Sequence, residues 1–195
     1  MPLDDSFTLI SGSISEESGI HNGIEMKVLV TYSSLTGNTQ KLAEGIYEGI
    51  SPEFKEIKPM KEVTDANDYD TILAGYWVDK GGPNEEAKKF LESLSGKKVG
   101  LFATLGYWPD TEHGMKSLIN GESIVKEKNQ VIAKYICQGK LSEKIISMFE
   151  KLPVDNPHAI TDEKRKRYEV AKNHPSSLDI AYAAELFRER LSVHV

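Results

Sequence analysis

Short apolar, β-branched runs alternate along the chain with segments whose apolar residues recur every three or four positions. The first pattern indicates buried strands and the second indicates amphipathic helices. Strands are predicted at 28–32, 54–58, 71–76, 99–104 and 131–137. Helices are predicted at 39–50, 87–94, about 112–118, around 145–149 and 180–191. The alternation predicts an α/β fold, in which helices cover both faces of a doubly wound, five-stranded parallel sheet.

Two places in the pattern are more specific. The strand at 54–58 is weakly apolar and is followed by Pro59, which favours a position at the edge of the sheet. Only residues 60–69 separate it from the next strand, so the crossover helix there must be short or lost. Near the end of the chain, Ser176 and Asp179 have the spacing of a capping box and predict the start of the last helix.

Residues 1–25 show no sustained periodicity and are rich in Ser, Gly and acidic residues. They lack the basic and apolar regions of a signal peptide and the arginines of a transit peptide. Met26 stands directly before a strand, as a natural start would. We expect 1–25 to be a flexible N-terminal extension or a remnant of the expression vector, and 26–192 to form one domain. Its core is expected at 26–152 and a helical segment at 153–192.

The charge of the chain is unevenly distributed. Lys and Arg number 24 and Asp and Glu number 30, which gives a net charge of −6. Residues 1–25 hold five acidic residues and no basic one, so the rest of the chain is close to neutral, at about −1. Such a balance gives no basic field for nucleic acid and no strongly acidic one.

The remaining composition narrows the class of protein. There is one cysteine, Cys137, so no intrachain disulfide can form, as is common in a reducing compartment. No apolar run approaches the length of about 20 residues that a membrane helix needs. The five histidines have no metal-binding spacing. We therefore expect a cytoplasmic protein without a metal site, a membrane segment or a nucleic-acid partner.

The loop at 33–39 connects the first predicted strand to the first predicted helix. Five of its seven side chains carry a short hydroxyl or amide group, and Gly37 stands among them. Backbone N–H groups at a helix start favour a bound anion, and hydroxyls can add donors. The loop lacks the lysine of a P-loop, and the GxGxxG pattern of dinucleotide sites is absent from the chain. These features favour a phosphate-binding loop over a plain polar turn.

This loop carries a family resemblance. Its residues Ser34-Leu35-Thr36-Gly37-Asn38-Thr39 match the [ST]-x-T-G-x-T signature with which flavodoxins hold the terminal phosphate of FMN. The preceding strand is similar to the first strand of flavodoxins, and the order of elements extends the resemblance over about 26–152. The resemblance implies a flavodoxin-like fold with extra C-terminal helices, noncovalent binding of FMN and transfer of electrons.

Further segments resemble one branch of the flavodoxin-domain proteins. They lie at 75–83, at 106–113, at 136–140 and at His174-Pro175. Members of this branch accompany bilirubin reductases in gut bacteria. The resemblance therefore implies a partner oxidoreductase that takes part in bilirubin reduction.

Both tryptophans of the chain follow apolar strands, in segments that we expect to be polar, glycine-bearing loops. Flavodoxins place one aromatic residue from each of these loops against the isoalloxazine ring. By position, Trp77 takes one face, and either Tyr107 or Trp108 takes the other. Asp79 follows close behind Trp77, whereas the glycines come later, so the contact to flavin N5 stays unassigned.

The resemblance and the loop positions together give a set of expected cofactor-binding residues. The set is Ser33, Ser34, Leu35, Thr36, Gly37, Asn38, Thr39, Tyr76, Trp77, Val78, Asp79, Gly81, Thr104, Leu105, Gly106, Tyr107, Trp108 and Asp110. No catalytic acid, base or nucleophile is expected. Cys137 is expected to pack as a small apolar residue. The basic run at 164–167 is expected to be a solvated helix face, with a docking patch as the alternative.

These features favour an electron carrier that exposes a flavin edge between 77–83 and 106–113 to a redox partner protein. Two alternatives remain open. The first is an FMN-dependent enzyme that oxidises NAD(P)H and reduces a quinone or similar acceptor, and the second is a non-catalytic module that binds FMN or phosphate.

Overall fold

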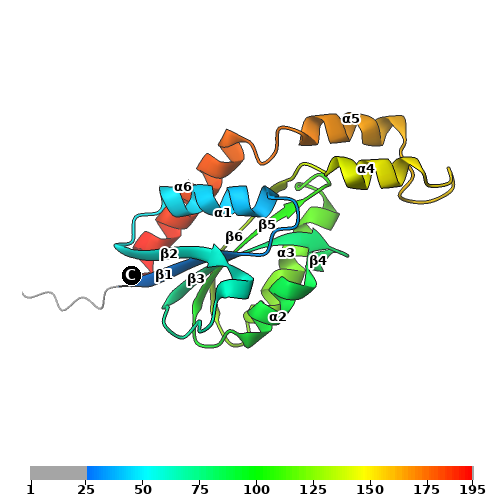
Figure 1. Cartoon of the computed structure of the whole chain (residues 1–195). Helices are drawn as coiled ribbons and strands as arrows, with labels where there is room; N and C mark the ends of the chain where they lie inside the picture. Colours follow the sequence, from blue (N-terminus) through cyan, green and yellow to red (C-terminus); the bar gives the residue numbers. More distant parts are fainter. Residues whose placement is uncertain (1–25, 195) are drawn as a thin grey trace, which may run out of the picture.

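The computed structural model describes residues 26–194, and the extension predicted at 1–25 lies outside the described residues. Five parallel strands form the sheet in the order β2-β1-β3-β5-β6, and a short strand, β4, pairs antiparallel with β3 (Figure 1). The strands are β1 Lys27–Tyr32, β2 Phe54–Pro59, β3 Thr71–Asp79, β4 Gly82–Pro83, β5 Lys98–Leu105 and β6 Gln130–Gln138. This topology confirms the predicted doubly wound parallel sheet and places β2 at its edge.

Helices cover both faces of the sheet. On one face, α1 (Asn38–Gly49) packs beside α6 (Ser177–Val193), and on the other α2 (Glu85–Ser93) packs beside α3 (Glu112–Val125). Each face has its own apolar core, because the strands present apolar side chains on both sides. The helix predicted at the end of the chain therefore completes one of the two layers. Of the helices in the described residues, none combines the length and apolar content that crossing a bilayer requires.

The connections between strands and helices agree with the lengths of the segments that separate them in the sequence. Between β2 and β3 the helix is reduced to one short 3₁₀ turn, η1 (Met60–Glu62). The predicted capping box at the start of α6 is present: Asp179 N–H donates to Ser176 Oγ at 3.2 Å, and Ser176 N–H donates to the Asp179 carboxylate at 2.6 Å. His174 Nδ1 shares a further hydrogen bond of 2.6 Å with that carboxylate.

Helices α4 (Glu143–Glu150) and α5 (Asp162–Ala171) lie side by side outside the two layers (Figure 1). We call residues 141–173 the arm. Its ends meet, because Lys140 N–H donates to the carbonyl of His174 at 3.0 Å. Within it, Arg165 of α5 pairs with Glu150 of α4 at 3.0 Å. The predicted core boundary at 152 thus falls inside the arm.

The structure corrects three expectations: Trp77 does not lie in a loop, the helix that begins at 112 does not end near 118, and Arg167 is not solvated. Strand β3 continues to Asp79, so Trp77 lies in a strand rather than in a loop, held there by pairing with β5 and β4. The turn from β3 to β4 has positive φ at Lys80 and Gly81, the pattern of a type I′ hairpin. Helix α3 runs well past residue 118, to Val125. In α5, Arg167 is buried rather than part of a solvated face.

Candidate functional site

The loop at 33–37 lies at the carboxyl end of β1, which stands between β2 and β3 in the sheet. The winding of the sheet reverses here, because the chain goes from β1 to β2 on one side and then continues with β3 on the other. In doubly wound sheets ligands bind outside the carboxyl ends of strands at this kind of reversal. Gly37 has φ of 90° and directly precedes α1. Within residues 26–194, the backbone N–H groups of Leu35, Thr36, Asn38 and Thr39 have no protein acceptor. The helix start therefore presents several unpaired donors to a ligand, as an anion site does.

The two serines of the loop have different surroundings. Ser33 is buried, accepts a hydrogen bond from Asn84 Nδ2 at 2.8 Å and donates to the Glu86 carboxylate. Its hydroxyl is thus engaged with the connection from β3 to α2 and with α2 itself. Ser34 Oγ instead accepts from Gly37 N–H at 3.1 Å, which closes the tight turn before α1. Of the two, only Ser34 lines the hollow described below.

Asn38 ties the loop to the start of the arm. Its side-chain amide donates to Thr36 Oγ1 at 3.1 Å and to the carbonyl of Lys140 at 2.7 Å. A Cβ on Gly139 would lie only 2.9 Å from Asn38 Nδ2, so a larger residue there would displace the Asn38 amide. Sequence reasoning gave Gly139 no role in the site, although the segment at 136–140 carried part of the family resemblance.

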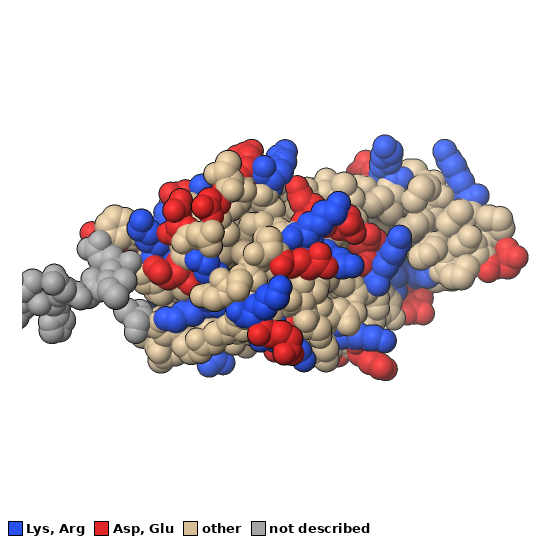
Figure 2. Space-filling view, turned by 90° about the horizontal axis from the view of Figure 1, so that it is seen from below, with Lys and Arg blue, Asp and Glu red and all other residues tan. Residues whose placement is uncertain are grey.

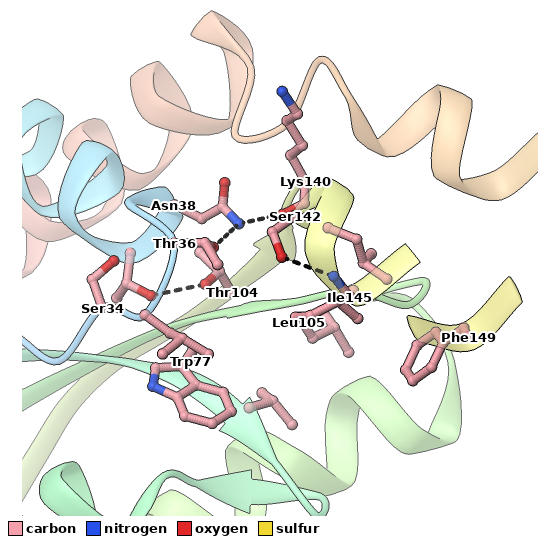
Figure 3. A pocket seen from close by; sticks show the side chains of 16 residues that line it. Ser34, Thr36, Asn38, Trp77, Thr104, Leu105, Lys140, Ser142, Ile145 and Phe149 are labelled. Carbon is pink, nitrogen blue, oxygen red and sulfur yellow. Dashed lines mark hydrogen bonds between the residues drawn. The ribbon is translucent and has the colours of Figure 1, made fainter. Parts of the chain in front are cut away.

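A hollow of about 680 Å³, part of it open to solvent, extends from this loop (Figure 3). The lining combines hydroxyl and amide groups with apolar side chains: Ser34, Leu35, Thr36, Asn38, Thr39, Trp77, Val78, Thr104, Leu105, Gly106, Gly139, Lys140, Leu141, Ser142, Ile145 and Phe149. Lys140 is the only ionisable residue of this lining, and its side chain extends away from Trp77 (Figure 3).

The shape of the hollow suits a molecule with two unlike ends. One end can place a phosphate against the N–H groups before α1 without any cation. The other end can place a flat apolar ring against Trp77 and the apolar side chains beyond it. The lining carries no carboxylate, histidine or thiol that could move a proton or attack a substrate.

Several expected site residues lie away from this hollow. Tyr76 is fully buried in the core on the α2 and α3 side, where its hydroxyl donates to the carbonyl of Ser117 at 3.2 Å. Burial raises the pKa of this phenol. Asp79 and Gly81 line a second hollow, which adjoins the first at Val78.

The loop after β5 contributes less to the hollow than expected. Leu105 and Gly106 line it, but Tyr107, Trp108 and Asp110 do not. The guanidinium of Arg167 stacks on one face of the Tyr107 ring, with its central carbon 4.4 Å from the ring centroid, and Tyr107 is 36% exposed. The carbonyl of Trp108 accepts a hydrogen bond from Thr111 Oγ1 at 2.8 Å, within the turn that leads into α3.

Three apolar residues of the arm line the hollow instead: Leu141, Ile145 and Phe149. The sequence pattern predicted a helix around 145–149 from Ile145, Ile146 and Phe149, but gave these residues no role in the site. Periodicity reveals that a helix has an apolar side and does not reveal what that side faces.

Cys137 lies beyond the hollow, buried near the end of β6. Burial, followed by the negative charge of Asp179, raises the pKa of its thiol, which keeps it protonated and unreactive. Within residues 26–194, no three His, Cys, Asp or Glu side chains are grouped so that they could hold a metal ion.

Comparison with known proteins identifies the family. A flavodoxin domain model matches residues 29–188. The flavodoxin-like domain-containing protein BilS of Clostridioides difficile (strain CD3) is 37% identical over 175 residues, which cover 86% of this chain and 97% of the relative. BilS of Clostridium symbiosum (strain WAL-14163) is 27% identical over 177 residues, which cover 80% of this chain and 91% of the relative.

Solved structures agree on the fold. The flavodoxin of Fusobacterium nucleatum, whose crystal structure has flavin mononucleotide bound, matches with a TM-score of 0.54 and 15% identity. The match covers 86% of this chain and 98% of that one. Together with the signature at 34–39 and the strand order β2-β1-β3-β5-β6, these matches show that the chain belongs to the flavodoxin domain family.

Proposed function

We propose that this chain binds FMN noncovalently in the hollow at the start of α1 and carries electrons to a partner oxidoreductase. The observation that supports this most strongly is the row of unpaired N–H groups at the start of α1, in the same hollow as Trp77. With a phosphate bound there, the ring system of the same ligand could lie against the indole of Trp77, which lines the same hollow.

The residues present fit FMN rather than a larger or uncharged flavin. The N–H groups and the hydroxyl of Thr36 are sufficient for one terminal phosphate, and Asn38 borders them. The apolar side of the hollow, with Trp77, Val78 and Leu105, suits the isoalloxazine ring. Bound FMN would supply the redox chemistry, while the protein binds it and surrounds it with apolar groups.

A carrier role agrees with the lining of the hollow. Transfer of an electron requires an exposed ring edge and a partner, whereas direct reduction of a substrate commonly uses a proton donor beside it. Lys140 is the only titratable residue that lines the hollow, and its side chain extends away from Trp77. We therefore favour the carrier over the NAD(P)H-dependent enzyme, and the binding module is separated from it by the second test below.

The partner is expected to dock locally rather than to be steered from a distance. Basic and acidic side chains are interspersed on the face shown in Figure 2, and the chain beyond residue 25 is close to neutral. Long-range steering needs a field of one sign, so the salt dependence of association should be weak. The branch resemblance makes a reductase of a linear tetrapyrrole the first candidate partner.

The first test compares FMN with riboflavin, using Gly37→Ala and the matched variant Gly96→Ala. Both glycines have positive φ and open space around the position of a Cβ, so either substitution strains only the backbone. Gly37→Ala should weaken FMN binding and leave riboflavin binding unchanged, whereas Gly96→Ala should change neither. Equal affinity of the wild type for FMN and riboflavin would contradict the phosphate site.

The second test separates the carrier from the alternatives. The FMN-loaded protein should be reduced by dithionite and reoxidised by an electron acceptor protein, as followed by the flavin absorption spectrum under anaerobic conditions. It should oxidise NADPH only slowly without a partner. Rapid turnover of NADPH by the protein alone would support the enzyme, and failure to cycle would support the binding module.

A further inference from the structure

We propose that helix α4 forms the second wall of the flavin site, so that the isoalloxazine lies between Trp77 and the face of α4 that carries Ile145 and Phe149. This inference rests on the proposed function. It replaces the expectation that Tyr107 or Trp108 provides the second wall.

The first support is the apolar face of α4, which is only partly buried. Phe149 stacks on His158 with ring centroids 5.4 Å apart and still lines the hollow. None of its residues is fully buried, although it is an amphipathic helix with apolar residues along one side. Ile145 and Phe149 are half-buried, lie one turn apart and line the hollow from the side opposite the signature loop (Figure 3). A flat apolar ligand would bury this face and remove apolar surface from water.

The second support is that Tyr107 already has partners. Arg167 of α5 stacks on one face of its ring at 4.4 Å, and His113 packs edge-on against it with ring centroids 6.0 Å apart, which leaves Tyr107 36% exposed. Arg167 is 8% exposed, and its Nε has no hydrogen-bond acceptor among the described residues. Freeing Tyr107 to reach a flavin would uncover this stacked cation and lose the contact.

The third support is that α4 is attached next to the residues that line the hollow. Gly139 N–H donates to the carbonyl of Leu105 at 2.8 Å, and Asn38 Nδ2 donates to the carbonyl of Lys140. Leu141 packs so closely on Gly106 that a Cβ there would lie 2.7 Å from Leu141 Cδ1. These contacts fix where α4 begins relative to the signature loop, so its apolar face is held over the hollow.

The experiment measures FMN affinity by titrating the apoprotein and following the quenching of flavin fluorescence. Phe149→Ala should weaken FMN binding about tenfold or more, because a large apolar side chain no longer covers the ring. Met148→Ala is the matched control: it is the neighbouring residue of α4, is 55% exposed and does not line the hollow. It should bind FMN as the wild type does, and so should Trp108→Ala.

Hydrogen exchange gives a readout that needs no substitution. Amides of α4 should exchange more slowly with bound FMN, and also with saturating riboflavin, since the ring and not the phosphate contacts the helix. Saturating inorganic phosphate alone should leave their exchange unchanged.

The outcomes separate the two proposals. If the wild type fails to bind FMN at all, the proposed function is wrong and this inference falls with it. If the wild type binds FMN, but Phe149→Ala matches Met148→Ala while Trp108→Ala binds more weakly, only the α4 wall is overturned. Unchanged exchange in α4 on binding of FMN would also overturn it.

Discussion

Thr39 and Thr104 form a buried hydrogen bond of 2.9 Å between the first turn of α1 and the end of β5. The signature motif explains why a threonine stands at 39, but not that its hydroxyl already has a partner in the protein. A buried hydroxyl that loses its partner is costly, whereas replacing both partners by apolar groups of the same shape is close to neutral. The pair therefore contributes to stability as well as to the shape of the hollow.

We predict that Thr39→Val lowers the free energy of unfolding by about 1–3 kcal/mol, because it leaves Thr104 Oγ1 unpaired. The double variant Thr39→Val/Thr104→Val should lose less than the sum of the two single variants. Urea unfolding at pH 7 for the four proteins of this cycle measures the difference. Strictly additive losses would mean that the two hydroxyls do not interact.

Ser33 and Tyr76 show what could not be predicted from the sequence at the level of single residues. Both were expected to bind the cofactor, yet Ser33 bonds to Asn84 and Glu86, and Tyr76 lies in the core. Neighbouring residues of a strand point to opposite faces, so adjacency to Trp77 placed Tyr76 on the wrong side. The face that each strand turns to the site depends on packing across the sheet, which a motif does not record.

Whole helices and strands follow the hydrophobic pattern closely, and the exceptions have physical causes. Strand β3 extends beyond its apolar residues, because pairing with β5 and β4 provides hydrogen-bond partners for its backbone as far as Asp79. Helix α3 continues through Asn120 and Gly121, which interrupt its periodicity. Gly121 is required there because a Cβ would lie 2.5 Å from the hydroxyl of Tyr76. Such tertiary contacts lie outside any local pattern.

The capping box at the start of α6 was predicted from the sequence and is present in the structure. Burial alone would raise the pKa of Asp179, but hydrogen bonds from the Ser176 backbone and the His174 ring lower it on balance. A lowered pKa in the folded state means that the ionised carboxylate stabilises the fold above its unfolded pKa of about 4. This stabilisation is lost as the pH falls through the folded pKa.

We predict that Asp179→Ala lowers the free energy of unfolding by about 1–2 kcal/mol at pH 7. The difference from the wild type should shrink as the pH is lowered from 5 towards 3, since the carboxylate then becomes protonated. Urea unfolding across this range measures it. Glu185→Ala is the control on the same helix, because its exposed pair with Arg188 should contribute little at any pH. A pH-independent difference for Asp179→Ala would contradict the assigned role of its charge.

At the level of the whole molecule, the arm is an insertion between β6 and α6. The two layers of helices and the sheet are complete without it, since α6 and not α4 packs beside α1. The sequence pattern predicted the helices of the arm and could not place them outside the layers. Whether an amphipathic helix packs on a sheet or on a ligand depends on what its apolar side meets.

We predict that replacing residues 141–173 by a short glycine linker yields a chain that still unfolds in one cooperative transition. The hydrogen bond between Lys140 N–H and the His174 carbonyl shows that a short linker can join the ends. Urea unfolding followed by circular dichroism, compared with the full chain, tests this. Loss of cooperativity would mean that the arm is part of the folding unit.

Because the two ends of the arm lie side by side, a change in its length alters the entropic cost of closing this loop, and so the stability of the fold, only slightly. Closing a flexible loop costs only about 0.6 kcal/mol more for each doubling of its length. Insertions and deletions within residues 141–173 can therefore accumulate while β6 and α6 keep their places. Selection can thus reshape the part of the arm beyond α4 without endangering the folding of the rest of the chain. Divergence in sequence should concentrate there rather than in α4, whose apolar face is proposed to cover the flavin.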